Sequence, residues 1–130
     1  MRFLLDTHAF VWAIGAPDRL SQRARAVISD SSNELLVSAV TAFEIATKHR
    51  LGKFPEAASL LLSYERTVEA LGARELPISS HHGLVAGQMV WSHRDPFDRI
   101  LAAQSVTEQF PLITSDAAFA TLDGVTTVWA

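Results

Sequence analysis

The chain lacks cysteine entirely, which excludes a disulfide framework and a zinc site built from thiolates. This absence fits a reducing compartment. Glycine and proline are also scarce, with 6 and 5 residues among 130, while apolar residues make up 48% and charged residues 19%. These proportions exclude a collagen-like chain, a low-complexity tail and an intrinsically disordered chain. A chain of this length corresponds to about one domain, so we expect a single globular domain over residues 1–130.

Long hydrophobic runs are missing as well. No stretch approaches the roughly 18 consecutive apolar residues that a membrane-spanning helix needs. The apolar N-terminal region is interrupted by Asp6 and His8, whereas a secretory signal carries an unbroken apolar region of about 7–15 residues. We therefore expect a soluble, cytoplasmic protein that does not associate with a membrane.

Positive charge is not in excess. The 11 basic and 14 acidic residues give a formal net charge of −3, and this balance argues against a protein that coats nucleic acid without specificity. Four of the 14 acidic residues are proposed below as site residues. The remaining 10 acidic residues are nearly balanced by the 11 basic ones. The acidity of the chain is thus attributable to one candidate site.

Short apolar segments alternate with helical segments along the chain. The apolar runs predict strands at residues 3–5, 34–40, 74–78, 111–114 and 126–129. Helices are expected at residues 8–14, 21–28, 41–51, 55–71, 80–91 and 96–109, with a short one after Asp116. The segment Thr41-Ala42-Phe43-Glu44 matches a capping box that opens the third helix. This alternation predicts a central parallel sheet of about five strands with helices on both faces, a three-layer α/β/α sandwich.

Acidic residues occupy the places where ligands bind in such folds, beyond the carboxyl ends of the strands. Asp6 and Asp116 directly follow predicted strands, Glu44 lies in the first turn of a helix, and Asp95 and Asp98 open another helix. Each acid could simply cap a helix and oppose its dipole. Capping does not explain why these acids occur together. Few other acids are placed in this way, and the helix that follows Asp95 would need only one acid as its cap.

Four carboxylates can gather only if something offsets their repulsion. Two unit charges about 5 Å apart repel by roughly 3 kcal/mol at an effective dielectric constant near 20. Mg²⁺ and Mn²⁺ bind carboxylate oxygens and cancel this repulsion. Metals held in this way support phosphoryl chemistry, because they lower the pKa of a bound water and stabilise the leaving oxygen. The acids therefore indicate a metal-dependent enzyme that acts on phosphodiesters.

Four segments add a family signal: residues 4–9 (LLDTHA), 38–46 (SAVTAFEIA), 93–104 (HRDPFDRILAAQ) and 112–116 (LITSD). Together, in this order and over nearly the whole chain, they resemble PIN domains, and they are most similar to the VapC-type toxins of bacterial toxin–antitoxin pairs. The resemblance implies an Mg²⁺- or Mn²⁺-dependent endoribonuclease that is often a homodimer and is inhibited by a small cognate antitoxin. It places the catalytic and metal-binding roles on Asp6, Glu44, Asp98 and Asp116, with Asp6 and Asp98 as the central ligands and Asp95 as an accessory residue.

Further polar residues lie beside these acids. Thr7 and Thr114 could orient a carboxylate, or they could only cap or close a turn. Lys48 lies four residues after Glu44 on the same helix face, so it forms either an ordinary ion pair or a contact with phosphate. Three residues bracket the acidic helix start and are candidates for contact with the scissile phosphate: His93, Arg94 and Arg99.

Two other functions remain open from the residues alone. A catalytically silent PIN module could bind RNA or a protein, although the retention of all four acids argues against it. A receiver-like phosphate-sensing domain also carries acids at the end of a parallel sheet, but Asp6 is followed by Thr7 where such a domain would have a second acid. The helical spacing of Phe10, Trp12 and Phe43 favours packing in the core over stacking on bases.

Overall fold

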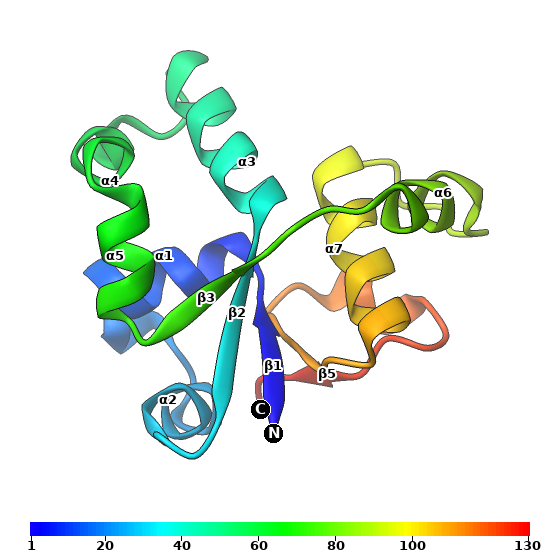
Figure 1. Cartoon of the computed structure of the whole chain (residues 1–130), viewed down its shortest axis with the longest axis horizontal. Helices are drawn as coiled ribbons and strands as arrows, with labels where there is room; N and C mark the ends of the chain where they lie inside the picture. Colours follow the sequence, from blue (N-terminus) through cyan, green and yellow to red (C-terminus); the bar gives the residue numbers. More distant parts are fainter.

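A five-stranded sheet forms the centre of the computed structural model, which describes residues 1–130 (Figure 1). All neighbouring strands run parallel, in the order β3-β2-β1-β4-β5. The strands are β1 Arg2–Leu5, β2 Glu34–Ser38, β3 Ala73–Leu76, β4 Leu112–Ile113 and β5 Thr127–Val128. The central strand, β1, is buried from Phe3 to Leu5, which explains why its sequence is continuously apolar instead of alternating.

Helices occupy most of the connections between the strands. The α-helices are α1 Thr7–Gly15, α2 Gln22–Ser29, α3 Ala39–Arg50, α4 Ala58–Leu62, α5 Tyr64–Ala70, α6 Ser80–Gln88 and α7 Pro96–Glu108. Three short 3₁₀ helices complete the set: η1 Pro17–Arg19, η2 Pro55–Ala57 and η3 Ala117–Thr121. None of these helices has the length and hydrophobicity that crossing a membrane requires.

Both faces of the sheet are covered, because successive side chains of each strand point to opposite faces. On one face, Leu5 packs in a cluster with Phe10 of α1. On the other face, Leu4 packs in a second cluster with Leu36 of β2 and Leu101 of α7. Figure 1 shows α1, α2, α4 and α5 on one side of the strands and α6 and α7 on the other. The predicted three-layer α/β/α sandwich is confirmed.

Three predicted helices differ from the structure, and one of them, α6, ends at Gln88 instead of at residue 91. Ser38 caps α3 by accepting a hydrogen bond from the backbone nitrogen of Val40 (3.1 Å), so the helix begins before Thr41 and the predicted capping box is wrong. The long helix expected at residues 55–71 is divided into η2, α4 and α5. Ser63 separates the last two, and its hydroxyl donates to the carbonyl of Ser59 (3.1 Å), a local bond that competes with regular helix geometry.

The order of the strands determines where a ligand site can form. The chain moves from β1 to one edge through β2 and β3, and then returns to the other side of β1 with β4 and β5. Ligands bind beyond the carboxyl ends of the strands at such a switch point. Asp6 and Thr114 directly follow β1 and β4, so both stand there. Receiver-type domains have the strand order 2-1-3-4-5 instead, and the receiver-like alternative is therefore wrong.

Candidate metal centre

Asp6 is held at the junction of β1 and α1, where it caps the helix. Its Oδ1 accepts a hydrogen bond from the backbone nitrogen of Ala9 (2.8 Å), and its Oδ2 accepts one from the hydroxyl of Thr114 (2.5 Å). The residue is only 5% exposed. Burial raises the pKa of Asp6 to about 6, against the opposing effect of the two hydrogen bonds. A buried carboxylate of this kind is costly to ionise, and a bound cation would offset that cost.

Glu44 lies in the second turn of α3, and each of its carboxylate oxygens has a partner. Thr7 donates a hydrogen bond to Oε1 (2.6 Å), and Lys48, one turn further along α3, pairs with Oε2. Burial by itself would lower the pKa of Lys48, but the bond to Glu44 and the nearby negative charges raise it. Lys48 therefore forms the intrahelical ion pair, and Thr7 joins α1 to α3.

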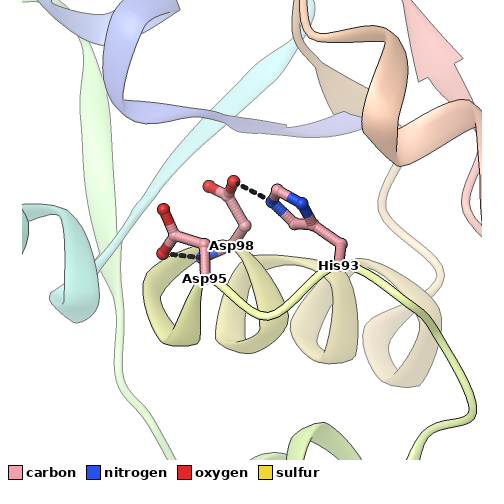
Figure 2. A group of neighbouring side chains, drawn as sticks. All are labelled: His93, Asp95 and Asp98. Carbon is pink, nitrogen blue, oxygen red and sulfur yellow. Dashed lines mark hydrogen bonds and ion pairs between the residues drawn. The ribbon is translucent and has the colours of Figure 1, made fainter.

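The start of α7 carries the other half of the site. Asp95 caps this helix, as expected, because its Oδ1 accepts hydrogen bonds from the backbone nitrogens of Phe97 (2.9 Å) and Asp98 (3.3 Å). The Oδ2 of Asp98 lies 2.7 Å from Nε2 of His93 (Figure 2). Burial raises the pKa of Asp98, and the charges of Asp95 and Glu44 raise it further, while the bond to His93 lowers it.

These groups converge on one region, although they come from α1, α3 and α7. The charge of Asp98 raises the pKa of Asp6, and the charges of Asp95 and Glu44 raise the pKa of Asp98. Such effects weaken with distance, so they indicate that Asp6, Glu44 and Asp95 each lie near Asp98. Figure 2 shows the carboxylates of Asp95 and Asp98 pointing away from their helix on the same side as the imidazole of His93.

The donor set fits a divalent cation. One ligand atom from each of His93, Asp95 and Asp98 can be chosen so that all three lie within 4.8 Å of one another. Carboxylate oxygens are the ligands that Mg²⁺ and Mn²⁺ prefer, and Mn²⁺ also accepts imidazole nitrogen. A cation here would lie close to several negative charges, of which Lys48 pairs with Glu44 and His93, when protonated, pairs with Asp98.

Asp116 stands apart from the other predicted site acids. Its side chain is exposed, and its Oδ1 caps η3 by accepting from the backbone nitrogen of Ala118 (2.9 Å). It connects to the group through its backbone nitrogen, which donates to the hydroxyl of Thr114 (3.0 Å), the same hydroxyl that donates to Asp6. Asp116 is not among the charges that shift the pKa of Asp6 or Asp98.

The two arginines expected near the scissile phosphate occupy different environments. Arg94 is exposed on the loop before α7. Arg99 points back toward the connection between α6 and α7. Its guanidinium donates to four backbone carbonyls, those of Ala86 (2.9 Å), Met89 (2.6 Å), Trp91 (3.1 Å) and His93 (3.0 Å). All three guanidinium nitrogens are therefore engaged in fixing the loop that carries His93.

Other residues at the site differ from what the sequence indicated. Thr41 is fully buried, and its hydroxyl lies 3.4 Å from that of Thr7. Its position three residues before Glu44, on the same face of the helix, is the signal that could have identified it. The prediction of a core position is confirmed for Phe10, which has no exposed surface, and wrong for Phe43, which is 64% exposed. Phe43 lies outward because it neighbours Glu44, which faces inward; its ring packs edge-on against Phe97 (5.4 Å between centroids).

One pocket lies outside the candidate metal centre. It has a volume of about 460 Å³ and is lined by residues of α1 and of the segment after α3, including Trp12, Arg19 and Lys53. The guanidinium of Arg19 lies over the ring of Trp12 (4.8 Å to the centroid). None of the site carboxylates lines this pocket, so it is a feature separate from the candidate metal centre.

Comparison with known proteins gives one family match. A family model described as PIN domain matches residues 3–125, which is most of the chain. No curated protein matches the sequence significantly.

Several solved structures have a similar fold. One is VapBC2 from Rickettsia felis bound to a DNA fragment from their promoter, with a TM-score of 0.68, 12% identity and full coverage of both chains. DNA-bound VapBC from Salmonella typhimurium has a TM-score of 0.65 at 16% identity, covering 98% of this chain and 97% of that one. FitAcB from Neisseria gonorrhoeae has a TM-score of 0.64 at 20% identity, with coverage of 98% and 96%. At these identities the likeness establishes the fold.

Proposed function

Because the chain belongs to the PIN domain family, whose members are typically nucleases, we propose that it is a metal-dependent endoribonuclease and the toxin of a toxin–antitoxin pair. One observation carries the proposal of metal-dependent chemistry. Asp6, Glu44 and Asp98 come from three separate segments, yet the charge of Glu44 raises the pKa of Asp98 and the charge of Asp98 raises the pKa of Asp6, which supports their gathering at the carboxyl edge of the sheet. Capping explains the individual acids at helix starts, but it does not explain their convergence.

The proposed ligands are Asp6, Glu44 and Asp98, with Asp95 as an accessory residue and Asp116 at the margin. A divalent ion bound there would lower the pKa of a water molecule and stabilise charge on the phosphate. Thr114 and Thr7 orient the carboxylates of Asp6 and Glu44 through hydrogen bonds of 2.5 and 2.6 Å. Partners that hold a ligand in this way are costly to remove from metal sites.

The chain's own residues also prepare the site for an anionic substrate. Asp6 and Asp95 cap α1 and α7, so the positive ends of two helix dipoles point toward this region. Lys48 offsets part of the charge of Glu44. Arg94 is exposed next to Asp95 and can reach a phosphate outside the carboxylate cluster. We propose that water attacks the phosphodiester, and that the 2′-hydroxyl does not, so cleavage leaves a 5′-phosphate and a 3′-hydroxyl.

The partners follow from the same proposal. The similar structures described above include VapBC complexes, and one further example is described as a toxin–antitoxin complex from Klebsiella pneumoniae. By analogy, we propose a small antitoxin as inhibitor and a homodimer as the assembled form of this chain. Growth arrest on expression, relieved by a small protein encoded directly upstream or by Asp6→Asn, is the expected result in cells.

The central test is cleavage of RNA by the purified protein. We expect cleavage in Mg²⁺ or Mn²⁺, none in EDTA, and a loss of about 100-fold or more in Asp98→Asn. Asp123→Asn is the matched control, because Asp123 is an exposed acid outside the site. Equal activity in EDTA would exclude the metal-dependent mechanism. RNA binding without metal-dependent turnover would instead support the silent binding module.

A further inference from the structure

His93 occupies a position that the acidic residues alone do not explain. Its Nε2 lies 2.7 Å from Oδ2 of Asp98, and it belongs with Asp95 and Asp98 to the group whose ligand atoms lie within 4.8 Å of one another. Two neighbouring ligands of one octahedral ion, with bonds of about 2.1 Å, lie about 3 Å apart. The separation of these two atoms is therefore close to that of two ligands sharing one ion, and the proton that joins them in the metal-free protein would leave to solvent when the ion binds.

The loop that carries His93 is firmly held. Arg99 donates hydrogen bonds to the carbonyls of Trp91 (3.1 Å) and His93 (3.0 Å) from a single nitrogen. The ring of Trp91 packs against the imidazole (4.8 Å between centroids), and its indole nitrogen donates to the hydroxyl of Thr121 (2.9 Å). An imidazole that packs against Trp91, on a backbone held by Arg99, presents its Nε2 in one direction, which is the arrangement that a metal ligand requires.

Unpaired oxygen atoms are concentrated at the same place. Asp95 uses Oδ1 for the cap, and Asp98 uses Oδ2 for His93, whereas the second oxygen of each accepts no hydrogen bond. In contrast, both oxygens of Asp6 and of Glu44 already have partners. The ligand atoms with the most free capacity therefore belong to Asp95 and Asp98, whose carboxylates lie on one side of the imidazole in Figure 2.

From this geometry we infer that His93 is a nitrogen ligand of the proposed metal centre, which makes it a mixed imidazole–carboxylate site that favours Mn²⁺ and the later first-row ions over Mg²⁺. The inference rests on the proposed function and specifies its cofactor. An imidazole ligand adds affinity for first-row transition ions, whereas Mg²⁺ favours oxygen ligands. His93 thus selects the metal as well as holding it.

Pulsed electron paramagnetic resonance of the Mn²⁺-loaded, full-length protein tests the ligand directly and needs no activity measurement. We expect ¹⁴N modulation of the Mn²⁺ spin echo in the wild type and its loss in His93→Gln. His93→Phe provides a second variant, which retains a ring against Trp91 and removes both nitrogens. His8→Gln is the matched control and should keep the modulation, because the charge of His8 acts on Asp6 but His8 is not in the group of possible ligands formed by His93, Asp95 and Asp98.

Titration calorimetry gives the second readout. We expect His93→Gln to weaken Mn²⁺ binding by about tenfold or more and Mg²⁺ binding by less than about threefold, so that the preference between the two ions narrows. If the wild type binds Mn²⁺ but shows no ¹⁴N modulation, the assignment of His93 is overturned and the carboxylate centre still stands. Failure of the wild type to bind either ion would overturn both this inference and the metal-dependent function.

Discussion

Thr7 donates a hydrogen bond of 2.6 Å to Glu44 and so links residues 37 positions apart in the chain. Both residues are buried, at 6% and 4% exposure. The bond fixes the first turn of α1 against the second turn of α3, and Glu44 depends on it because Lys48 reaches only the other oxygen. A small hydroxyl in the interior therefore determines how one of the proposed ligands is oriented.

Replacing this hydroxyl should weaken the proposed metal site. Thr7→Val keeps the shape of the side chain and removes the donor, which leaves one oxygen of Glu44 buried without a partner. We expect a loss of about 1–3 kcal/mol in the free energy of unfolding and of about 10–100-fold in metal affinity. Denaturation by urea and titration with Mn²⁺ measure the two effects. Thr7→Ser restores the hydroxyl and should recover most of both, and equal losses in the two variants would contradict this role.

The position of Asp116 predicts that the four acids contribute unequally to the rate of RNA cleavage. Asp116 is exposed and caps η3, and it reaches the group only through Thr114. We expect Asp116→Asn to lower the rate of RNA cleavage by less than about tenfold, compared with about 100-fold or more for Asp98→Asn. Single-turnover cleavage at saturating Mn²⁺ compares them. Equal losses would show that Asp116 moves into the cluster when metal and RNA bind.

The pKa of Asp6 predicts how stability depends on pH when metal is removed. The pKa is raised by burial from 3.8 to about 6, so the folded state disfavours the charged form. Well below pH 3.8 the carboxyl is protonated in both the folded and unfolded states and has no effect. As the pH rises from about 4 to about 6, the carboxyl ionises in the unfolded state before it does in the folded state. The free energy of unfolding therefore falls by up to about 3 kcal/mol.

Urea denaturation in EDTA at pH 4 and pH 7 measures this loss, and Asp6→Asn isolates the share of Asp6 from that of other groups. Between the two pH values, the stability of the variant should fall by about 2–3 kcal/mol less than that of the wild type. Mg²⁺ or Mn²⁺ added at pH 7 should restore stability to the wild type, because the ion binds the charged form. A wild type and variant with the same pH dependence would contradict the raised pKa.

The sequence predicted the sheet and its layers because the signals for them are local. Each strand is a short apolar run, and the alternation with helices leaves few ways to arrange a parallel sheet. The start of α7 was equally predictable, because Asp95 followed by Pro96 is a strong local cap. The beginning of α3 was missed because Ser38 and Thr41 are both good capping residues, and only the end of β2 decides between them.

The sequence predicted which acids form the candidate site, but it did not predict how their side chains are placed relative to one another. The position of Glu44 relative to Asp6 depends on how α3 packs against α1, and no local pattern encodes it. The exposure of Phe43 follows from the same packing, because Glu44 takes the inward-facing position. The carbonyl partners of Arg99 belong to the preceding loop, whose path is set by α6 and α7 together. Charge alone made Arg99 resemble a phosphate ligand.

Arg99 provides the last prediction, because its surroundings indicate that it positions the loop and does not bind RNA. Arg99→Lys replaces a planar fork of donors by one ammonium group, which cannot reach four carbonyls in different directions. We expect a loss of about 2–4 kcal/mol in the free energy of unfolding and a weaker affinity for Mn²⁺, because the loop holding His93 loosens. Arg94→Lys is the matched control and should leave both quantities nearly unchanged, since Arg94 is exposed. If Arg99→Lys instead raised the KM for RNA while stability and Mn²⁺ affinity stayed at their wild-type values, Arg99 would be a phosphate ligand after all.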